Sequence, residues 1–254
     1  MTIKNHILNG VATIEIARPE KKNAITSAMY QAMADALRAA QTDPTVRAVL
    51  IHGQPEIFTS GNDLEDFMNA PPRDMTSPVF QFMFALLECE KPVIAAVTGA
   101  AIGIGTTMLM HCDFVFVADE ARLAMPFVSL GLVPEFASSV TVSALIGPRM
   151  AAEHLLLGDP FTGQQALDYG IANAVLPSTE VVKHARRVAE RFNALPPSGV
   201  RESKKLMRRG TDKLIREAIE AEAAIFGARL RGPEAQEAFQ AFFQKRRPDF
   251  SKFE

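Results

Sequence analysis

Short apolar runs alternate with segments of helical periodicity through the first 150 residues, and this alternation limits the possible folds more than any other feature. Runs rich in β-branched and other apolar residues lie at 46–51, 93–97 and 113–118. Apolar residues recur at helical spacing at 26–43, 79–87, 103–110 and 137–146. Short buried strands that alternate with helices predict a layered α/β core.

The two ends of the chain differ from this middle part. Residues 3–8 and 11–17 alternate as strands do, and Asn9-Gly10 between them predicts a tight β-hairpin. After residue 149 the strand signal nearly disappears and helical periods dominate. We therefore expect a core over residues 1–198 and a helical C-terminal region over residues 199–254.

The C-terminal region carries an apolar stripe. Its members are Ile215, Ile219, Phe226, Phe239, Phe242 and Phe243. A peripheral helix pair could not easily hide so large a stripe, and large exposed apolar patches mark interfaces. We expect an oligomer, with packing against the chain's own core as the alternative.

Composition narrows the function classes. The chain is 48% hydrophobic and 22% charged with a net charge of -2, which excludes a disordered or collagen-like chain. This charge balance gives no reason to expect nucleic acid as a partner. Two cysteines without CxxC spacing and a start without a secretory signal favour a cytoplasmic protein with reduced thiols, and no membrane segment is expected. A small-molecule enzyme or an interaction protein remains.

Two segments place glycine between a strand and a helix. In residues 57–64, Gly61 precedes a first helical turn that carries Asp63 and Glu65. Residues 97–107 lead from a strand into an apolar helix and carry glycines at 99, 103 and 105. Glycine allows close backbone approach, and free N–H groups at a helix start attract negative charge. The second segment fits neither GxGxxG nor the P-loop, so a close-packed helix start is equally possible.

These segments, with the sequence RPEKKNA at 18–24 before them and Cys112-Asp113 after them, carry a family resemblance. The chain resembles the crotonase, or enoyl-CoA hydratase/isomerase, superfamily from the first hairpin through residues 245–250. The resemblance implies an α/β fold, a spiral of ββα units whose helical C-terminal region forms trimers, often paired into hexamers. It also implies an acyl-CoA thioester substrate. Coenzyme A is part of that substrate, so no separate cofactor is expected, and five histidines without paired-ligand spacing indicate no metal.

The resemblance also assigns site residues. The main-chain N–H groups of Asn62 and Ile104 are expected to form an oxyanion hole for the thioester carbonyl, so the side chains at these positions should matter little. Substrate-binding positions follow from the same motifs: Lys22, Ala24, Ser60, Gly61, Asp63, Leu64, Gly103, Gly105, Thr107, Phe127 and Phe136. Of these, Asp63 is expected to order its turn rather than to perform chemistry.

Two departures from the family's hydratases are informative. Those enzymes hold and activate water with two glutamates, and here the matching positions are Thr107 and Phe127. Neither transfers a proton as a carboxylate does, and Phe127 would exclude water. Glu135 remains, in a segment that resembles the peroxisomal-type Δ3,Δ2-enoyl-CoA isomerases and their bacterial relatives, where the glutamate at this place is the base. Alternatively, Glu135 only occupies the first turn of a helix that follows Pro134.

We therefore expect an isomerase that shifts a double bond from the 3 to the 2 position, with Glu135 as its proton carrier. Burial against Phe127 and Phe136 would raise the pKa of Glu135. The alternatives are an enoyl-CoA hydratase that uses Glu135 alone and a catalytically silent acyl-CoA-binding protein. A ClpP-like serine peptidase ranks last, since no nucleophilic serine with a following histidine is recognisable.

Basic residues of the C-terminal half allow two interpretations. The first group comprises Lys204, Lys205, Arg208 and Arg209, and the second comprises residues 245–247. Such groups are usually solvated helix faces. The resemblance also allows them to approach the phosphates of coenzyme A.

Overall fold

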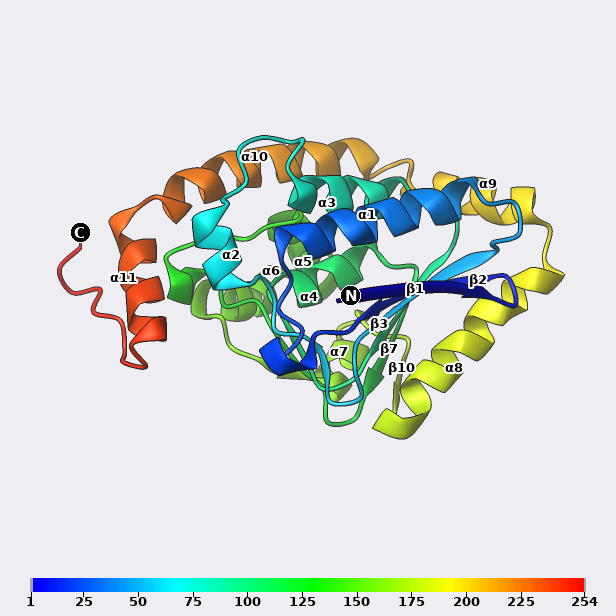
Figure 1. Ribbon diagram of the computed structural model, residues 1–254, viewed down its shortest axis with the longest axis horizontal. Helices are drawn as coiled ribbons and strands as arrows, with labels where there is room; N and C mark the ends of the chain where they lie inside the picture. The colour runs from blue at the N-terminus through cyan, green and yellow to red at the C-terminus, as the bar shows by residue number, and fades with distance from the viewer. Residues whose placement is uncertain (1, 254) are drawn as a thin grey trace.

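Two β-sheets with helices around them make up the computed structural model, which describes residues 2–253 (Figure 1). The larger sheet has the strand order β1-β2-β3-β5-β7-β10. Its strands are β1 (Ile3–Leu8), β2 (Val11–Ile16), β3 (Ala48–His52), β5 (Val93–Val97), β7 (Phe114–Ala118) and β10 (Ala174–Leu176). The β1–β2 hairpin is antiparallel and the other pairs are parallel. The predicted hairpin and the three predicted inner strands are confirmed.

The smaller sheet has the strand order β4-β6-β8-β9. Its strands are β4 (Ile57–Thr59), β6 (Ala100–Ile102), β8 (Arg122–Ala124) and β9 (Phe161–Thr162). Strands β4, β6 and β8 each follow a strand of the larger sheet and precede helical structure, so the chain repeats a ββα unit. This arrangement confirms the expected α/β class. The sequence indicated a strand before Gly61, where β4 lies, but it did not reveal β6, β8 and β9, because two or three residues are too few to show an alternating pattern.

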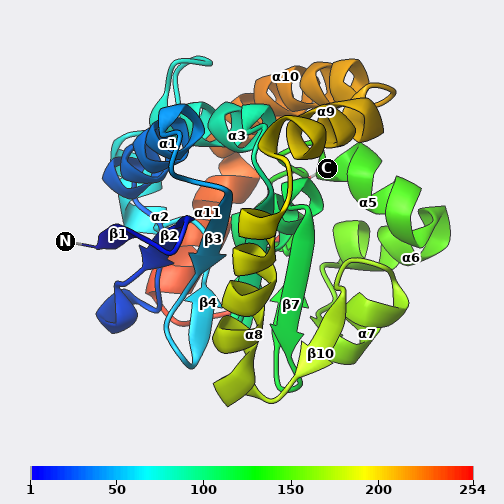
Figure 2. The same ribbon diagram turned by 90° about the vertical axis from the view of Figure 1, so that its right-hand side faces the viewer.

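Helices cover the larger sheet. Before residue 195 they are α1 (Ser27–Thr42), α2 (Leu64–Asn69), α3 (Pro78–Glu88), α4 (Ile104–Thr107), α5 (Ser138–Ile146), α6 (Pro148–Ala152), α7 (Gly163–Asp168) and α8 (Ser178–Glu190). Helix α8 packs against β3, β5 and β7 and runs along the front of these strands in Figure 2. Helices α1 and α3 pack against each other. Thr26 caps the start of α1, since its side chain accepts a hydrogen bond from the Met29 N–H.

Three helices form the C-terminal region: α9 (Pro197–Arg208), α10 (Asp212–Leu230) and α11 (Pro233–Phe243). Helix α10 contacts α5 and α11, and it lies along the top of the molecule in Figure 1. The helical character expected for this region is confirmed. Among residues 2–253 we find no helix with the length and apolar character needed to cross a membrane.

The apolar stripe of the C-terminal region divides into two parts. Ile219, Phe226 and Phe239 are buried against the chain's own core. Phe242 and Phe243 keep 59% and 48% of their surface exposed. Packing against the chain's own core is therefore confirmed for the first part, whereas an interface at Phe242 and Phe243 stays a prediction.

Two of the basic residues on α9 are not solvated. Lys204 is buried, and its Nζ donates to Asp113 Oδ2 at 2.5 Å and to the Lys91 carbonyl at 2.7 Å. Arg208 donates to Asp113 Oδ1 at 3.2 Å and to the main-chain oxygens of Leu87 and His111. These contacts fasten α9 to the core, so the expectation of a solvated face is wrong for both residues.

Candidate active site

The two glycine-containing segments lie directly against each other. Gly61 has φ of +90°, and a Cβ atom there would stand 2.9 Å from the Ile102 carbonyl oxygen. A Cβ atom on Gly105 would stand 2.5 Å from Thr59 Cγ2. Any side chain at these positions would push the segments apart. The expected close backbone approach is confirmed.

The segment around Asn62 is held by Ile25. The Ile25 N–H donates to the Gly61 oxygen at 2.8 Å, and the Asp63 N–H donates to the Ile25 oxygen at 2.9 Å. Because both groups that flank Asn62 face Ile25, its own N–H points to the opposite side. Within residues 2–253 neither this N–H nor that of Ile104, the first residue of α4, donates a hydrogen bond. Both N–H groups therefore lack an acceptor among the described residues.

The segment at residues 18–24 supports this loop. Arg18 Nη1 donates to Asp63 Oδ2 at 2.6 Å, and Asp63 Oδ1 accepts from the Asp66 N–H to cap α2. The Asn23 side chain donates to the main-chain oxygens of Ile16 and Phe58. Asp63 therefore orders its turn, as the sequence indicated.

A cavity of about 630 Å³, here the glycine-loop cavity, opens beside these segments. The predicted positions that line it are Lys22, Ala24, Ser60, Gly61, Asn62, Asp63, Leu64, Gly103 and Phe127. Ile104, Gly105 and Thr107 are fully buried and are not among its lining residues. The structure thus gathers most of the predicted substrate-binding positions around one cavity.

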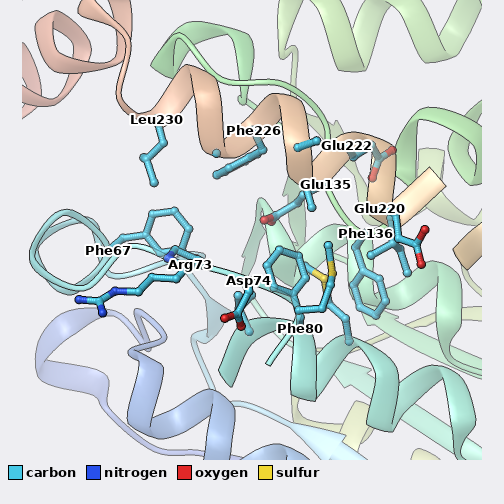
Figure 3. Close-up of a pocket in the computed structure, with 18 of the residues that line it drawn as sticks. Phe67, Arg73, Asp74, Phe80, Glu135, Phe136, Glu220, Glu222, Phe226 and Leu230 are labelled. Atoms are coloured by element: carbon cyan, nitrogen blue, oxygen red, sulfur yellow. The ribbon is translucent and has the colours of Figure 1, made fainter. Parts of the chain in front are cut away.

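A second cavity of about 250 Å³, here the Glu135 cavity, lies between α3 and α10. Glu135 and Phe136 line it, and Figure 3 shows the Glu135 side chain reaching in beneath α10. Phe67 and Phe226 line both cavities, with their ring centroids 6.0 Å apart in an edge-to-face arrangement. The two cavities therefore meet at this aromatic pair.

Glu135 has the surroundings of a functional carboxyl group. It is buried, and its Oε1 has no hydrogen-bond partner among the described residues. Burial, and next the charge of Glu222, raise its pKa to about 8, while the side chain of Asn62 acts in the opposite direction. A carboxyl group in this state gains and loses a proton close to neutral pH.

The backbone around Glu135 excludes the structural interpretation of this residue. Helix α5 begins at Ser138, so Glu135 does not lie in its first turn. Phe136 and Ala137 have φ of +58° and +57°, in the left-handed region that non-glycine residues rarely adopt. The carboxylate that accepts hydrogen bonds from the start of α5 belongs to Glu222. Glu135 is therefore not the group that stabilises this helix.

Two residues that contact the predicted site, Tyr30 and Glu222, were not identified from the sequence. Tyr30, which occupies an apolar-face position of α1, donates its hydroxyl hydrogen to Asn62 Oδ1. The Asn62 side chain therefore has a partner of its own, while the expectation that it matters little for the oxyanion hole stays a prediction. Glu222 falls on the apolar stripe, three residues after Ile219 and four before Phe226. A charged residue within a stripe of apolar residues was the signal in the sequence that could have identified Glu222.

The arrangement combines two chemical capacities. Free main-chain N–H groups can stabilise a negative charge that develops on an oxygen atom. A single carboxyl group with a raised pKa can take up a proton and return it. An apolar cavity around that carboxyl group limits access of water.

A comparison with protein-family models agrees with this chemistry. The model of the enoyl-CoA hydratase/isomerase family matches residues 6–252. The chain belongs to this family. It is an acyl-CoA enzyme of the enoyl-CoA hydratase/isomerase type, and the crotonase-like fold expected from the motifs is confirmed.

Some relatives within the enoyl-CoA hydratase/isomerase family are named as hydratases and others as isomerases. Crotonyl-CoA hydratase of Syntrophomonas wolfei is 32% identical over 244 residues, which cover 94% of each chain. Enoyl-CoA delta isomerase 2 of Rattus norvegicus is 33% identical over 243 residues, which cover 93% of this chain and 62% of the rat protein. Membership in the family therefore does not decide between hydration and isomerisation.

Solved structures of the family superpose closely on this chain. Pseudomonas aeruginosa OdaA shares 52% identity with a TM-score of 0.93, over 95% of this chain and 98% of that one. An enoyl-CoA hydratase/isomerase from Pseudoalteromonas atlantica shares 37% identity with a TM-score of 0.94, over 98% of this chain and all of that one.

The positions of the two hydratase glutamates hold no carboxyl group here. Thr107 is fully buried, and its Oγ1 has no hydrogen-bond partner among the described residues. Phe127 is also buried and turns an apolar side chain toward the glycine-loop cavity. Glu135 is therefore the buried carboxyl group that remains from the predicted site.

Proposed function

We propose that this chain is a Δ3,Δ2-enoyl-CoA isomerase with Glu135 as its single proton carrier. The observation that carries the proposal is the buried Glu135 carboxyl group, which lines an apolar cavity with one oxygen unpartnered among the described residues. Moving a double bond by one carbon needs one group that removes a proton and returns it nearby. Hydration in this family uses two carboxyl groups, and Thr107 and Phe127 leave only one.

Both cavities take part in substrate binding. The coenzyme A end lies in the larger glycine-loop cavity, where Lys22 lines the wall. The acyl chain passes Phe67 and Phe226 into the Glu135 cavity, whose lining is mostly apolar. Asn62 lines the first cavity, and its side chain interacts with Glu135 in the second. The thioester carbonyl therefore lies at the junction, within reach of the N–H groups of Asn62 and Ile104.

The reaction proceeds by one proton transfer in each direction. The Glu135 carboxylate removes a proton from C2 of the 3-enoyl thioester, and the electron pair moves onto the thioester oxygen to give a dienolate. The N–H groups of Asn62 and Ile104 stabilise this oxygen, and one such donor is worth about 3 kcal/mol. Protonated Glu135 then returns the proton at C4, which leaves the double bond between C2 and C3. A pKa of about 8 suits both halves of the exchange.

Hydration of 2-enoyl-CoA is the second candidate. It is supported by similar relatives whose names say hydratase, such as the Syntrophomonas wolfei protein. In this chain Glu135 would have to activate water alone, beside the apolar side chain of Phe127. This requirement places hydration behind isomerisation.

Two parallel incubations test the proposal. The pure protein is mixed with 3-enoyl-CoA in one and with 2-enoyl-CoA in the other, and the conjugated thioester is followed by its absorbance. We expect conjugated thioester to form in the first at a higher rate than it is lost in the second. The reverse order would establish a hydratase. Binding of both thioesters without turnover of either would establish a silent acyl-CoA-binding protein.

The assembly proposed for this chain is a homotrimer or a dimer of trimers, with contacts made by the region of residues 199–254. Exposed apolar side chains on these helices support it, among them Leu206, Met207, Phe242 and Phe243. Closed cyclic symmetry would cover such faces.

A further inference from the structure

Glu222 is a buried carboxylate on α10 that accepts three hydrogen bonds from the start of α5. The Ala137 N–H donates to its Oε2 at 2.6 Å, and the Ser139 N–H donates to its Oε1 at 3.0 Å. The Ser139 hydroxyl also donates to Oε1. Ala137 lies 85 residues from Glu222 in the sequence. A distant helix therefore caps α5 where no local side chain does.

The segment that this cap holds is the one that carries Glu135. Phe136 and Ala137 both have left-handed backbone conformations, which cost free energy and persist only where surrounding contacts impose them. His111 holds the same segment from the other side, since its Nε2 bonds the Phe136 oxygen at 2.8 Å and its ring stacks on Phe136. Glu222 and His111 together fix the backbone directly after Glu135.

We propose that Glu222 is a positioning residue for the reaction, which fixes the Glu135 carboxyl group at the cavity by holding Ala137 and Ser139. The inference rests on the proposed role of Glu135 as proton carrier. Glu222 lines the same cavity as Glu135. Burial raises the pKa of Glu222, and its three hydrogen bonds act in the opposite direction. When Glu222 is ionised, its charge makes a second charge on Glu135 less favourable. Glu222 therefore affects both the place and the proton affinity of Glu135.

Other titratable or charged groups face Glu135 from every element packed around it. They are Tyr30 on α1, Arg73 and Asp74 before α3, His111 after α4, Glu220 on α10 and Arg231 after α10. Tyr30 and His111 are buried, and burial keeps both neutral near pH 7, with the pKa of His111 lowered to about 4. Arg73, Asp74, Glu220 and Arg231 are exposed to solvent, which screens their charges. Besides Glu135, Glu222 is the buried carboxyl group that lines this cavity.

The test compares Glu222→Gln with Glu217→Gln, which removes the same charge from an exposed position on the same helix. In Glu222→Gln one of the two main-chain N–H groups loses its acceptor, and the negative charge beside Glu135 is lost. We expect kcat to fall about tenfold with KM within about twofold, and the rise of kcat with pH to move to lower pH by about one pH unit. Glu217→Gln should match the parent in all three. Parental kcat and pH profile in Glu222→Gln would overturn the proposal, and so would a lower kcat with the parental pH profile, which would show a structural role only.

Two further measurements cover the case in which Glu222→Gln folds poorly or the parent does not isomerise. Ser139→Ala removes one donor and keeps the charge, so kcat should fall about two- to threefold with the pH profile unchanged. In protein whose glutamates carry ¹³C at the carboxyl carbon, the ¹³C signal of Glu135 reports the titration of this group. The signal is assigned as the one that is absent from Glu135→Gln. That titration should move to lower pH in Glu222→Gln whether or not the protein turns over substrate. An unmoved titration would overturn the inference, whereas a moved titration without isomerase activity would overturn the proposed function alone.

Discussion

Glu135 is kept in a state that is unfavourable for the folded protein. Its pKa rises from 4.5 to about 8 on folding, because burial and the nearby Glu222 disfavour the charged form. Below pH 4.5 the carboxyl group is protonated in both the folded and the unfolded chain. As the pH rises toward 8 the unfolded chain ionises first, so the folded state loses stability relative to it. This loss is the expected consequence of a base held ready in an apolar cavity.

The first prediction is a pH-dependent gain of stability in Glu135→Gln. Glutamine cannot ionise, so the variant avoids this loss, which amounts to at most about 5 kcal/mol above pH 8. Thermal unfolding of parent and variant should give similar Tm values near pH 4 and a higher Tm for the variant near pH 9. Glu217→Gln, with its exposed side chain, serves as the control. A variant that is less stable than the parent at pH 9 would contradict the raised pKa.

At this scale the sequence predicts Glu135, the proposed proton carrier, but not the residues that hold its segment in place. Glu135 and the N–H groups of Asn62 and Ile104 follow from local motifs. Glu222 and Tyr30 reach the site through contacts between distant segments, such as the bond from Ala137 to Glu222 across 85 residues. Local periodicity contains no information on such contacts.

Among the secondary-structure elements, the β4–α2 and β6–α4 connections carry the two N–H groups that we propose as the oxyanion hole. Each connection contributes one free N–H group, and glycines let them approach. The small sheet of β4, β6 and β8 sets their register, with Ile57 opposite Ala100 and Ala100 opposite Arg122. Glycine patterns predict this meeting, whereas the three-residue strands that align it carry too short a pattern to be found.

The second prediction concerns Gly105. Its replacement by valine places a Cβ atom 2.5 Å from Thr59 Cγ2 and forces the two connections apart. Affinity for an unreactive acyl-CoA, measured by calorimetry, should fall about tenfold or more. Gly210→Val is the matched control, since a Cβ atom on Gly210 would have no neighbouring atom within 4 Å. Equal affinity in Gly105→Val and Gly210→Val would show that the N–H groups do not hold the thioester.

At the scale of the whole molecule, the ββα spiral and the C-terminal helices jointly build the site. The spiral supplies the glycine-loop cavity, and α10 closes the Glu135 cavity with Glu222, Phe226 and Leu230 (Figure 3). The division at residue 198 expected from the sequence stays a prediction, and residues from both sides of it line the two cavities. Phe242 and Phe243 line the glycine-loop cavity from α11 and remain exposed.

The third prediction concerns assembly. Exposed apolar side chains on α9 and α11 should be covered by other copies of the chain. Light scattering coupled to size-exclusion chromatography should report the mass of a trimer or of a dimer of trimers at micromolar concentration. A monomeric mass under these conditions would contradict the proposed assembly.

The turnover of Glu135→Gln tests the central claim most directly. Glutamine preserves the size of the side chain and much of its hydrogen bonding but cannot accept the C2 proton. Isomerisation of 3-enoyl-CoA should fall about a hundredfold or more, while affinity for the thioester stays close to that of the parent. Parental isomerase turnover in Glu135→Gln would contradict the assignment of Glu135 as the proton carrier.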